Sequence, residues 1–425
     1  MRLQLQIHEV RRTAWASQTR LADGVLEIDC EALRAALLGD TRLTSVDLEL
    51  VQPGESCRVL PVFDILEPRC KIEPAGADFP GVLGPVRSVG MGITRVLRGA
   101  AVTILNPDVN PDTLVPGRLP ALDLSGSPLP GVQVAEANRY ASLAHVVVIP
   151  RFARGLPAND RLLALRNACL RAAAWLAREP SPGEPAAEET YELTPCDHDL
   201  PRVAYVYQMH SHQRPTVPGE PLLYGDNCRY LLPTAIHPNE LLDGALLRSY
   251  QTTTVQTYAI QNHATVLDLY RRHGRELSFA GVVVAVANQL PEEKQRATIL
   301  AANIVRWGLQ AQGAVFTKAP GGAANVDMAM VAARCEELGV RTSVMVSESS
   351  GDDPADSFML FNYPALNAVV GIEPGPTASL PAVERVVAPS AALAERFQGE
   401  MPHGAFDNLG VRDYLGGGRV APVLY

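Results

Sequence analysis

The second half of the chain alternates short apolar runs with longer helix-like runs, and this alternation limits the fold more than any other feature. Strands that are apolar along their whole length are typical of parallel sheets whose two faces are covered by helices. The pattern therefore predicts a Rossmann-like parallel α/β domain over residues 196–425. Its expected strands are RVAYVYQM, FAGVVVAVAN, GAVFTKA, RTSVMVSES and NAVVGIEP.

The first half has a different pattern. RLQLQIHEV, GVLEIDC, SVDLELVQPG and SCRVLPVFDILEPRCKIEP alternate polar and apolar residues, as half-buried antiparallel strands do. The run LPANDRLLALRNACLRAAAWLAREP predicts one long helix with Asn159 or Asp160 as its N-cap. We therefore predict the α/β class, with a mixed β-rich α+β domain over 1–178. A Pro- and Glu-rich linker over 179–195 is expected to separate it from the second domain.

Composition excludes several classes of protein. The 425 residues carry a net charge of −9, which argues against a nucleic-acid or anionic-membrane surface. No apolar run reaches the roughly 18–20 residues of a membrane span. MRLQLQIHEVRRT alternates like a strand and not like a signal peptide, so a cytoplasmic location is expected. The seven cysteines are scattered without a CxxC pair, which makes a disulfide framework or a cysteine zinc site unexpected.

Two loops follow predicted strands at the sheet edge where ligands gather in parallel α/β folds. TKAPGGAANVD places Gly321 and Gly322 before a helix that Asn325 could cap, an arrangement suited to a carboxylate or phosphate. SESSGDDPAD offers Glu348 and neighbouring carboxylates to an amine or a divalent cation. A plain turn and a hydrated acidic loop are the alternatives.

Histidines suggest a second kind of site. His210 and His212 stand two apart in QMHSHQR, so on a strand both imidazoles would point to one side and could meet one metal ion. His198, Cys196 and His237 could complete the ligand set. A structural or solvent-facing role for these side chains is the alternative.

The segment HPNELLDGALL predicts a helix with Asn239 as its cap and with Glu240 and Asp243 on one face. Two neighbouring carboxylates could orient an amine or serve as acid and base. Solvation of a helix end is the alternative. In GDNCRY, Cys228 could be a nucleophile if its pKa were lowered, or an inert buried thiol.

Long segments resemble a known family, the alpha-plus-beta proprotein subunit of component B of the glycine, sarcosine and betaine reductases, and more distantly the D-proline reductase proprotein. The matches follow one another in order over nearly the whole chain. They include DGVLEID, SVDLELVQPGES, ILEPRCKIEP, FPGVLGPVRSVGMGITRVLRGAAV, LPRVAYVY, LLPTAIHPNELLDGALL, QNHATVLDLYRRHGRELSFAGVVV and VAARCEELGVRTSVMVS.

The resemblance implies a mechanism. In that family the chain cleaves itself at an Asn-Cys or Thr-Cys step after the DGA segment, and the cysteine becomes a pyruvoyl group. The resemblance implies that its carbonyl forms a Schiff base with the substrate amine. A cysteine or selenocysteine on a separate subunit then attacks, and the C–N bond is cleaved reductively. A thiol- or selenol-bearing partner subunit, a small amine substrate and a hetero- or homo-oligomer are therefore expected.

This chain departs from the family at the cleavage point. After Ala245 it reads LLRSYQTTTVQTY, and no cysteine stands between Cys228 and Cys335, so a pyruvoyl group is not expected. One interpretation is that Thr252, Thr253 or Thr254 attacks in an N→O acyl shift and leaves a 2-oxobutyryl group. A second is an intact chain with a repurposed pocket. A third is a non-catalytic scaffold for a redox-active partner.

We expect the second interpretation, an uncut reductase subunit acting on a small amine or amino-acid-like substrate. A metal-dependent enzyme built on His210 and His212 with a divalent metal, and the scaffold, are the alternatives. The expected catalytic residues are Thr252, Thr253, Thr254, Tyr258 and His263, and the expected substrate-binding residues are Glu240, Asp243, Gln256, Gln261, Asn262, Gly321, Gly322 and Glu348.

Overall fold

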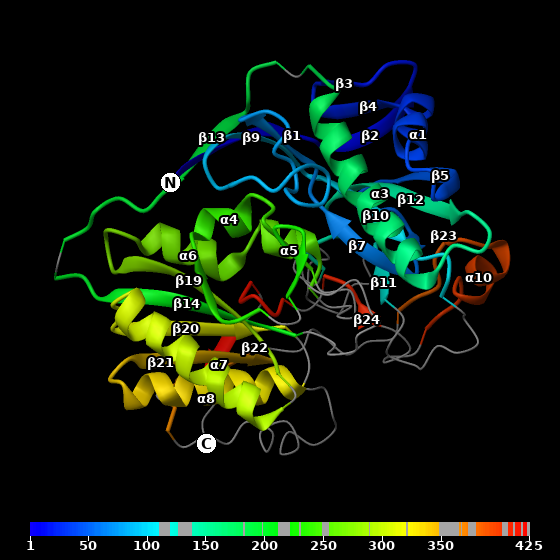
Figure 1. The fold of residues 1–425 in the computed structure, drawn as a ribbon. Coiled ribbons are helices and arrows are strands. Elements are labelled where there is room, and N and C mark those ends of the chain that lie inside the picture. The colour runs from blue at the N-terminus through cyan, green and yellow to red at the C-terminus, as the bar shows by residue number, and fades with distance from the viewer. Residues whose placement is uncertain are drawn as a thin grey trace.

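The structure is a computed structural model of the 425-residue chain, and it shows a β-rich N-terminal half beside a C-terminal parallel sheet (Figure 1). It describes residues 1–109, 120–125, 138–181, 183–197, 199–210, 222–228, 231–248, 255–288, 290–319, 322–347, 365–366, 368–372, 380–401, 407–410, 413–417 and 420–422.

The N-terminal half contains mixed sheets. One runs in the order β13 (Ala187–Glu192), β1 (Arg2–Glu9), β9 (Gly92–Arg98), β8 (Arg69–Glu73). A second runs β5 (Leu43–Val51), β12 (Ala144–Phe152), β10 (Ala100–Leu105), β7 (Val62–Leu66). A third runs β2 (Arg12–Ala16), β4 (Val25–Asp29), β3 (Arg20–Ala22), and α1 (Cys30–Leu38) follows it. The pairs β1–β9, β10–β12 and β2–β4 are parallel and the other pairs are antiparallel.

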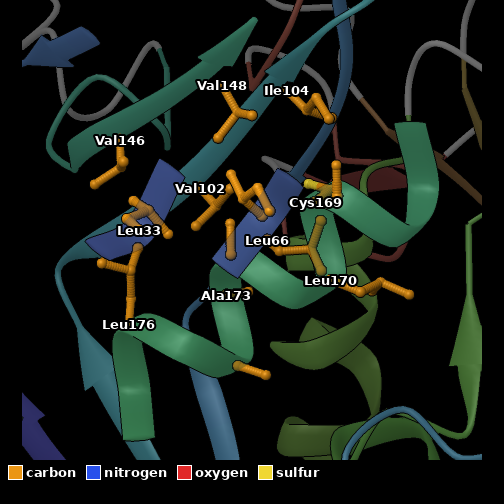
Figure 2. Close-up of a cluster of buried hydrophobic side chains, with 14 of the residues drawn as sticks. Leu33, Leu66, Val102, Ile104, Val146, Val148, Cys169, Leu170, Ala173 and Leu176 are labelled. Carbon is orange, nitrogen blue, oxygen red and sulfur yellow. The ribbon is translucent and has the colours of Figure 1, made fainter. Parts of the chain in front are cut away.

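Helix α3 (Ala158–Arg178) covers the second sheet and closes the main N-terminal core. Figure 2 shows its side chains against those of α1 and of alternate positions on β10 and β12, because residues two apart on a strand share a face. The residues labelled there are Leu33, Leu66, Val102, Ile104, Val146, Val148, Cys169, Leu170, Ala173 and Leu176.

The predicted N-cap of this helix was wrong. The helix begins at Ala158, its cap is Pro157, and no side chain bonds the cap position. Asn159 and Asp160 therefore lie inside the first turn. There the negative charge of Asp160 faces the positive end of the helix dipole.

Among the described residues, seven strands form the C-terminal sheet, and its five central strands are mutually parallel as predicted. The antiparallel strands β17 and β25 flank them. Across the sheet, the second parallel strand of the chain comes first, followed by the first, third, fourth and fifth. The sheet order is β17 (Thr234–Ile236), β19 (Ser278–Val286), β14 (Arg202–Met209), β20 (Gly313–Lys318), β21 (Arg341–Ser347), β22 (Ala368–Ile372), β25 (Val420–Pro422).

Helices cover both faces of this sheet. On one face lie α7 (Pro291–Asn303), with the π-helical turn Ile304–Gly308 that continues it, and α8 (Gly322–Glu337). On the other lie α4 (Pro238–Leu242), α5 (Thr257–Gln261) and α6 (Ala264–Arg272), which separate the sheet from the N-terminal half (Figure 1). The mixed α/β class predicted from the sequence is confirmed.

The remaining elements tie distant parts of the chain together. The sheet β23 (Arg385–Val387), β6 (Cys57–Val59), β11 (Pro120–Asp123), β24 (Asp407–Asn408) joins late segments to the N-terminal half, with α10 (Ala391–Arg396) nearby. Within the expected linker, β13 pairs with β1, so that segment contributes an edge strand and not only a solvated connection. The small sheet β16 (Asp226–Asn227), β15 (Leu222–Leu223), β18 (Leu246–Leu247) lies beside α4 and α5. The division into two domains stays a prediction.

Two further sequence expectations concern cysteines and membranes. The seven cysteines all lie in described residues and form no disulfide. No helix in the described ranges is long and apolar enough to cross a bilayer.

Arg58 on β6 fastens a late segment to the N-terminal half. Its side chain is fully buried, and its Nε donates to Asp123 Oδ2 at 2.8 Å. Its other nitrogens donate to the backbone oxygens of Phe397, of Gly399 at 3.1 Å and of Pro381 at 2.8 Å. These hydrogen bonds to carbonyl oxygens of the segment 381–399, together with the ion pair, offset the free-energy cost of burying the guanidinium.

We predict that Arg58→Ala lowers the free energy of unfolding by about 3–5 kcal/mol, because it leaves the Asp123 carboxylate buried without its cation. Arg271→Ala, which removes an exposed ion pair with Asp268, is the matched control and changes it by less than about 0.5 kcal/mol. Urea denaturation measures both, and equal effects of the two variants would contradict this account.

Candidate functional site

A short capped helix, α4, ends just before the DGA segment, which is Asp243, Gly244 and Ala245. In α4, His237 Nδ1 accepts a hydrogen bond from Asn239 N at 3.2 Å, and Glu240 Oε1 accepts one from His237 N at 2.6 Å. These two bonds form a capping box around His237. The predicted cap, Asn239, was wrong. It lies in the first turn, where its buried amide donates to the backbone oxygens of Gly90 and Tyr191, each at 3.0 Å.

Asp243 follows α4 and lies in a buried ion pair with the N-terminal half. Its carboxylate accepts hydrogen bonds from Lys71 Nζ at 2.7 Å, Thr94 Oγ1 at 2.6 Å and Gly90 N at 2.7 Å. The side chains of Asp243 and Lys71 are 1% and 3% exposed. Charge-assisted bonds of this kind fix the carboxylate in one position.

The two carboxylates of this segment do not share a helix face as predicted. The helix ends at Leu242, so Asp243 leaves its face, while Glu240 Oε2 accepts a hydrogen bond from Tyr224 Oη at 2.5 Å. Glu240 therefore caps the start of α4 and accepts a hydrogen bond from Tyr224. Gly244 then turns the chain with φ +87°, and a Cβ there would lie 3.1 Å from the ring of Phe79, so glycine suits the position.

A second buried charge pair holds the end of α5. Glu67 Oε2 accepts from Arg69 Nε at 2.7 Å, and Arg69 donates further to Leu242 O at 2.6 Å and Asn262 Oδ1 at 3.0 Å. Gln261 bonds the backbone of Glu67 with both ends of its amide, at 3.0 and 3.3 Å. The predicted residues Gln261 and Asn262 therefore lie beside β8 and join the two halves of the molecule.

The start of α5 is held by Asp64. Thr257 donates to Asp64 through its backbone N at 2.9 Å and its hydroxyl at 2.6 Å. Burial raises the pKa of Asp64, and the nearby Arg248 guanidinium opposes this rise. Gln256, a predicted binding residue, accepts a hydrogen bond from Tyr140 Oη at 3.2 Å. Its neighbour Thr257 makes the bonds to Asp64, and sequence reasoning missed it.

Of the predicted catalytic residues, His263 is buried and Tyr258 is partly buried, and both are closely packed. The Tyr258 ring lies 5.4 Å from that of Tyr140, edge on, and burial raises the pKa of its hydroxyl. His263 caps α6 by accepting from Val266 N through Nδ1 at 3.4 Å. Its Nε2 lies 2.8 Å from Tyr205 Oη and must donate, since Nδ1 accepts. Burial lowers the pKa of His263 to about 4, so the ring is neutral near pH 7.

A small pocket opens beside Asp243 and Gly244, with space for about one water molecule. Cationic and anionic side chains both reach it, and the Cys70 thiol on its wall has its pKa raised to about 11 by burial. Its lining residues are Arg69, Cys70, Lys71, Asp78, Phe79, Thr94, Asp243, Gly244 and Gln261. Asp243 and Gln261 were predicted from the sequence. The residues from β8 and β9 were not, because no local motif marks them.

Several predicted site residues lie outside the described ranges and are left out of the description of the site. Of the loop glycines, Gly322 begins α8, and of the paired histidines, His210 follows β14. No three potential metal ligands gather among the described residues, and His237 and His263 each cap a helix. The predicted site residues outside the described ranges are His198, His212, Thr252, Thr253, Thr254, Gly321 and Glu348.

Comparison with known proteins identifies the family. The sequence model of the glycine/sarcosine/betaine reductase component B subunits matches residues 1–405. The chain belongs to this family, so the resemblance seen in the sequence is confirmed, and a role as a reductase-type subunit follows. No solved structure matches the chain.

Curated relatives cover most of the chain. The glycine reductase complex component B subunits alpha and beta of Acetoanaerobium sticklandii are 30% identical over 397 residues, which is 91% of this chain and 89% of the relative. The sarcosine reductase complex component B subunit alpha of Peptoclostridium acidaminophilum is 28% identical over 91% of this chain and 89% of the relative. The betaine reductase complex component B subunit alpha of the same organism is 28% identical over 87% and 84%.

We predict strong energetic coupling between Lys71 and Asp243. Asp243→Ala alone lowers the free energy of unfolding by about 3–5 kcal/mol, because it leaves a buried ammonium without its anion. Adding Lys71→Met removes that ammonium, so the double variant loses at least about 2 kcal/mol less than the sum of the single losses. Urea denaturation of the four proteins measures the coupling.

The half-exposed pair Arg98–Glu189 is the matched control, and its cycle of Arg98→Met and Glu189→Ala is additive within about 0.5 kcal/mol. Additive effects at Lys71 and Asp243 would show that the pair does not hold the two halves together.

The neutral His263 predicts a loss of stability in acid. The ring has its pKa lowered to about 4, whereas an unfolded histidine titrates near 6.5, so between these pH values only the unfolded chain binds this proton. Stability therefore falls as the pH drops through this range, by ~2 kcal/mol at pH 5 from this residue.

His263→Asn keeps a capping side chain and removes this titration. The variant should lose ~2 kcal/mol less than the natural protein between pH 7 and pH 5 in urea denaturation. An identical loss in both proteins would mean that His263 does not stay neutral in the folded chain.

Proposed function

We propose that this chain is the component B-type subunit of a reductase complex that acts on a small amine- or carboxylate-bearing substrate through C–N bond chemistry. Family membership supports the reductase role. The observation that carries the proposal is the pocket beside Asp243 and Gly244, which lies at the DGA segment and presents both cationic and anionic side chains. A substrate with an amine and a carboxylate matches such a pocket in charge, and the pocket must widen from the space of one water molecule to admit it.

The residues of the pocket receive different roles. Asp243 already accepts three hydrogen bonds, so we assign it to holding Lys71 in place and not to acid–base chemistry. Arg69 and Gln261 position the pocket wall through Glu67. His263 is buried and Tyr258 is partly buried, neither side chain lines the pocket, and we assign both positioning roles. The three threonines Thr252–Thr254 remain predicted lining residues.

We propose that the backbone stays uncut. A pyruvoyl group arises from a cysteine in the family that the sequence resembles, and no cysteine stands between Cys228 and Cys335. The residues present therefore do not fit this group, and no step is routed through it. The redox chemistry is assigned to a thiol- or selenol-bearing partner subunit in a cytoplasmic hetero-oligomer, since burial raises the pKa of the Cys70 thiol at the pocket. The parallel sheet is interpreted as Rossmann-like.

Intact mass tests this proposal. Mass spectrometry of the purified, denatured protein should give one species near 45.7 kDa, and hydroxylamine should add no mass, because the protein holds no keto-acyl carbonyl. Two fragments that divide near residues 249–254, the carboxyl-terminal one reacting with hydroxylamine, would overturn the uncut chain.

A matched variant separates the interpretations. If fragments formed, replacing Thr252, Thr253 and Thr254 together by Val would abolish them only if a threonine is the attacking group.

The substrate is tested separately by mixing the uncut protein with a dithiol and glycine, sarcosine or betaine, the compounds in the relatives' names. Release of an amine that the Gln261→Leu variant loses, while its unfolding stays cooperative, supports the pocket. An equal rate in this variant would contradict it.

A further inference from the structure

The carboxyl edge of the parallel sheet holds a pair of buried polar side chains that the proposed function does not use. β14 and β20 are neighbouring parallel strands, and their last paired residues are Gln208 and Lys318. Ala319 N donates to Gln208 O at 2.8 Å, which holds the register to the strand ends. Directly paired residues on parallel strands point to one face. Two residues earlier on each strand, Val206 and Phe316 pack in the core under α8.

The strand order reverses at this position. β14 comes first in the chain but lies between β19 and β20, so the connections that leave it and reach its neighbours cross opposite faces of the sheet. In open α/β sheets ligands bind at the carboxyl ends of the strands where the order reverses in this way. Gln208 and Lys318 stand at the ends of the two strands in question.

Gln208 is buried without hydrogen bonds to its side chain. Its residue is 1% exposed, and neither Oε1 nor Nε2 has a partner among the described residues. Each such unsatisfied buried group lowers the stability of the folded state. Asn325, in the first turn of α8 a few residues after β20, has its Oδ1 buried and unpaired in the same way. Gln208 and Asn325 thus both carry buried polar atoms without partners among the described residues.

Lys318 differs from the other lysines of the chain. The sequence contains three lysines, and the other two have carboxylate partners, Asp243 for Lys71 and Asp327 for Lys294. Lys318 is 3% exposed and makes no ion pair with any described residue. Its Nζ lies 3.5 Å from Ala319 O, a long contact, and 6.0 Å from the centre of the Tyr414 ring. Burial lowers the pKa of its amine to about 8, so most of it stays charged at pH 7.

The ammonium of Lys318 and the amide of Gln208 belong to paired residues of neighbouring strands, and together they lack one chemical group, an anion with two oxygens. A carboxylate would accept from Lys318 Nζ and Gln208 Nε2 together, and it would compensate the burial of both. Gln208 Oε1 would remain to accept from a hydroxyl or amine next to that carboxylate. The loop sequence TKAPGG, in which Lys318 lies, independently suggested an anion site.

We propose that Lys318 and Gln208 bind the carboxylate of a small organic acid at the carboxyl edge of the C-terminal sheet. The site shares no residue with the pocket beside Asp243, and it does not rest on the proposed function. It gives the subunit a second, separate place for a carboxylate ligand.

Thermal unfolding in sodium acetate and in sodium chloride at equal ionic strength and pH 7 tests this proposal. Acetate should raise the Tm of the natural protein saturably above its value in chloride, because only the folded state holds the site. Lys318→Met keeps the length and apolar stem of the side chain and removes the ammonium, so it should weaken the acetate affinity at least tenfold.

Lys294→Met is the matched control, because it removes a lysine that already has a carboxylate partner, and its acetate response should equal that of the natural protein. Gln208→Met is the second variant and decides the matter if Lys318→Met does not fold; it should weaken the affinity several-fold. Equal Tm values of the natural protein in acetate and chloride would overturn the proposal. An acetate response of Lys318→Met as strong as that of the natural protein would also overturn it. If Lys318→Met does not fold, the same result for Gln208→Met would overturn it.

Discussion

The ion pair between Lys71 and Asp243 is the interaction on which the site depends. A lysine and an aspartate this deeply buried lose their hydration, and only mutual contact and further hydrogen bonds offset that loss. Thr94 and Gly90 supply those bonds from the N-terminal half. The position of the DGA segment on the N-terminal half is therefore coupled to the charge of one carboxylate.

The same principle repeats around the segment that carries the three threonines. The described residues on its two sides are held by buried polar groups, since Thr257 bonds Asp64 and the end of α5 bonds Glu67. Arg248, before the segment, has its guanidinium 5.2 Å from the ring centre of Phe63. The energetic effect of these contacts is to fix the ends of the segment against β7 and β8. The candidate pocket opens beside these strands.

The sequence predicted the elements of the fold better than the site. The five parallel strands followed from apolar runs, because burial on both faces leaves a local signal that needs no knowledge of distant residues. The predicted cap of α4 was wrong, because His237 caps this helix and Asn239 does not. A capping box depends on which side chain turns back to the backbone, and the sequence does not show this. Lys71, Thr94 and Arg69 reach the pocket from more than 140 residues away, as their contacts with Asp243 and Asn262 show, and no spacing rule marks such pairs.

The central claim is that a small substrate binds beside Asp243 in a chain whose backbone is continuous. A crystal structure of the protein with bound glycine tests both parts at once. The account predicts ligand density against Asp243, Gly244 and Gln261, with unbroken main-chain density from Arg248 to Val255. A break in that main chain, or a ligand bound at Lys318 with none beside Asp243, would contradict it.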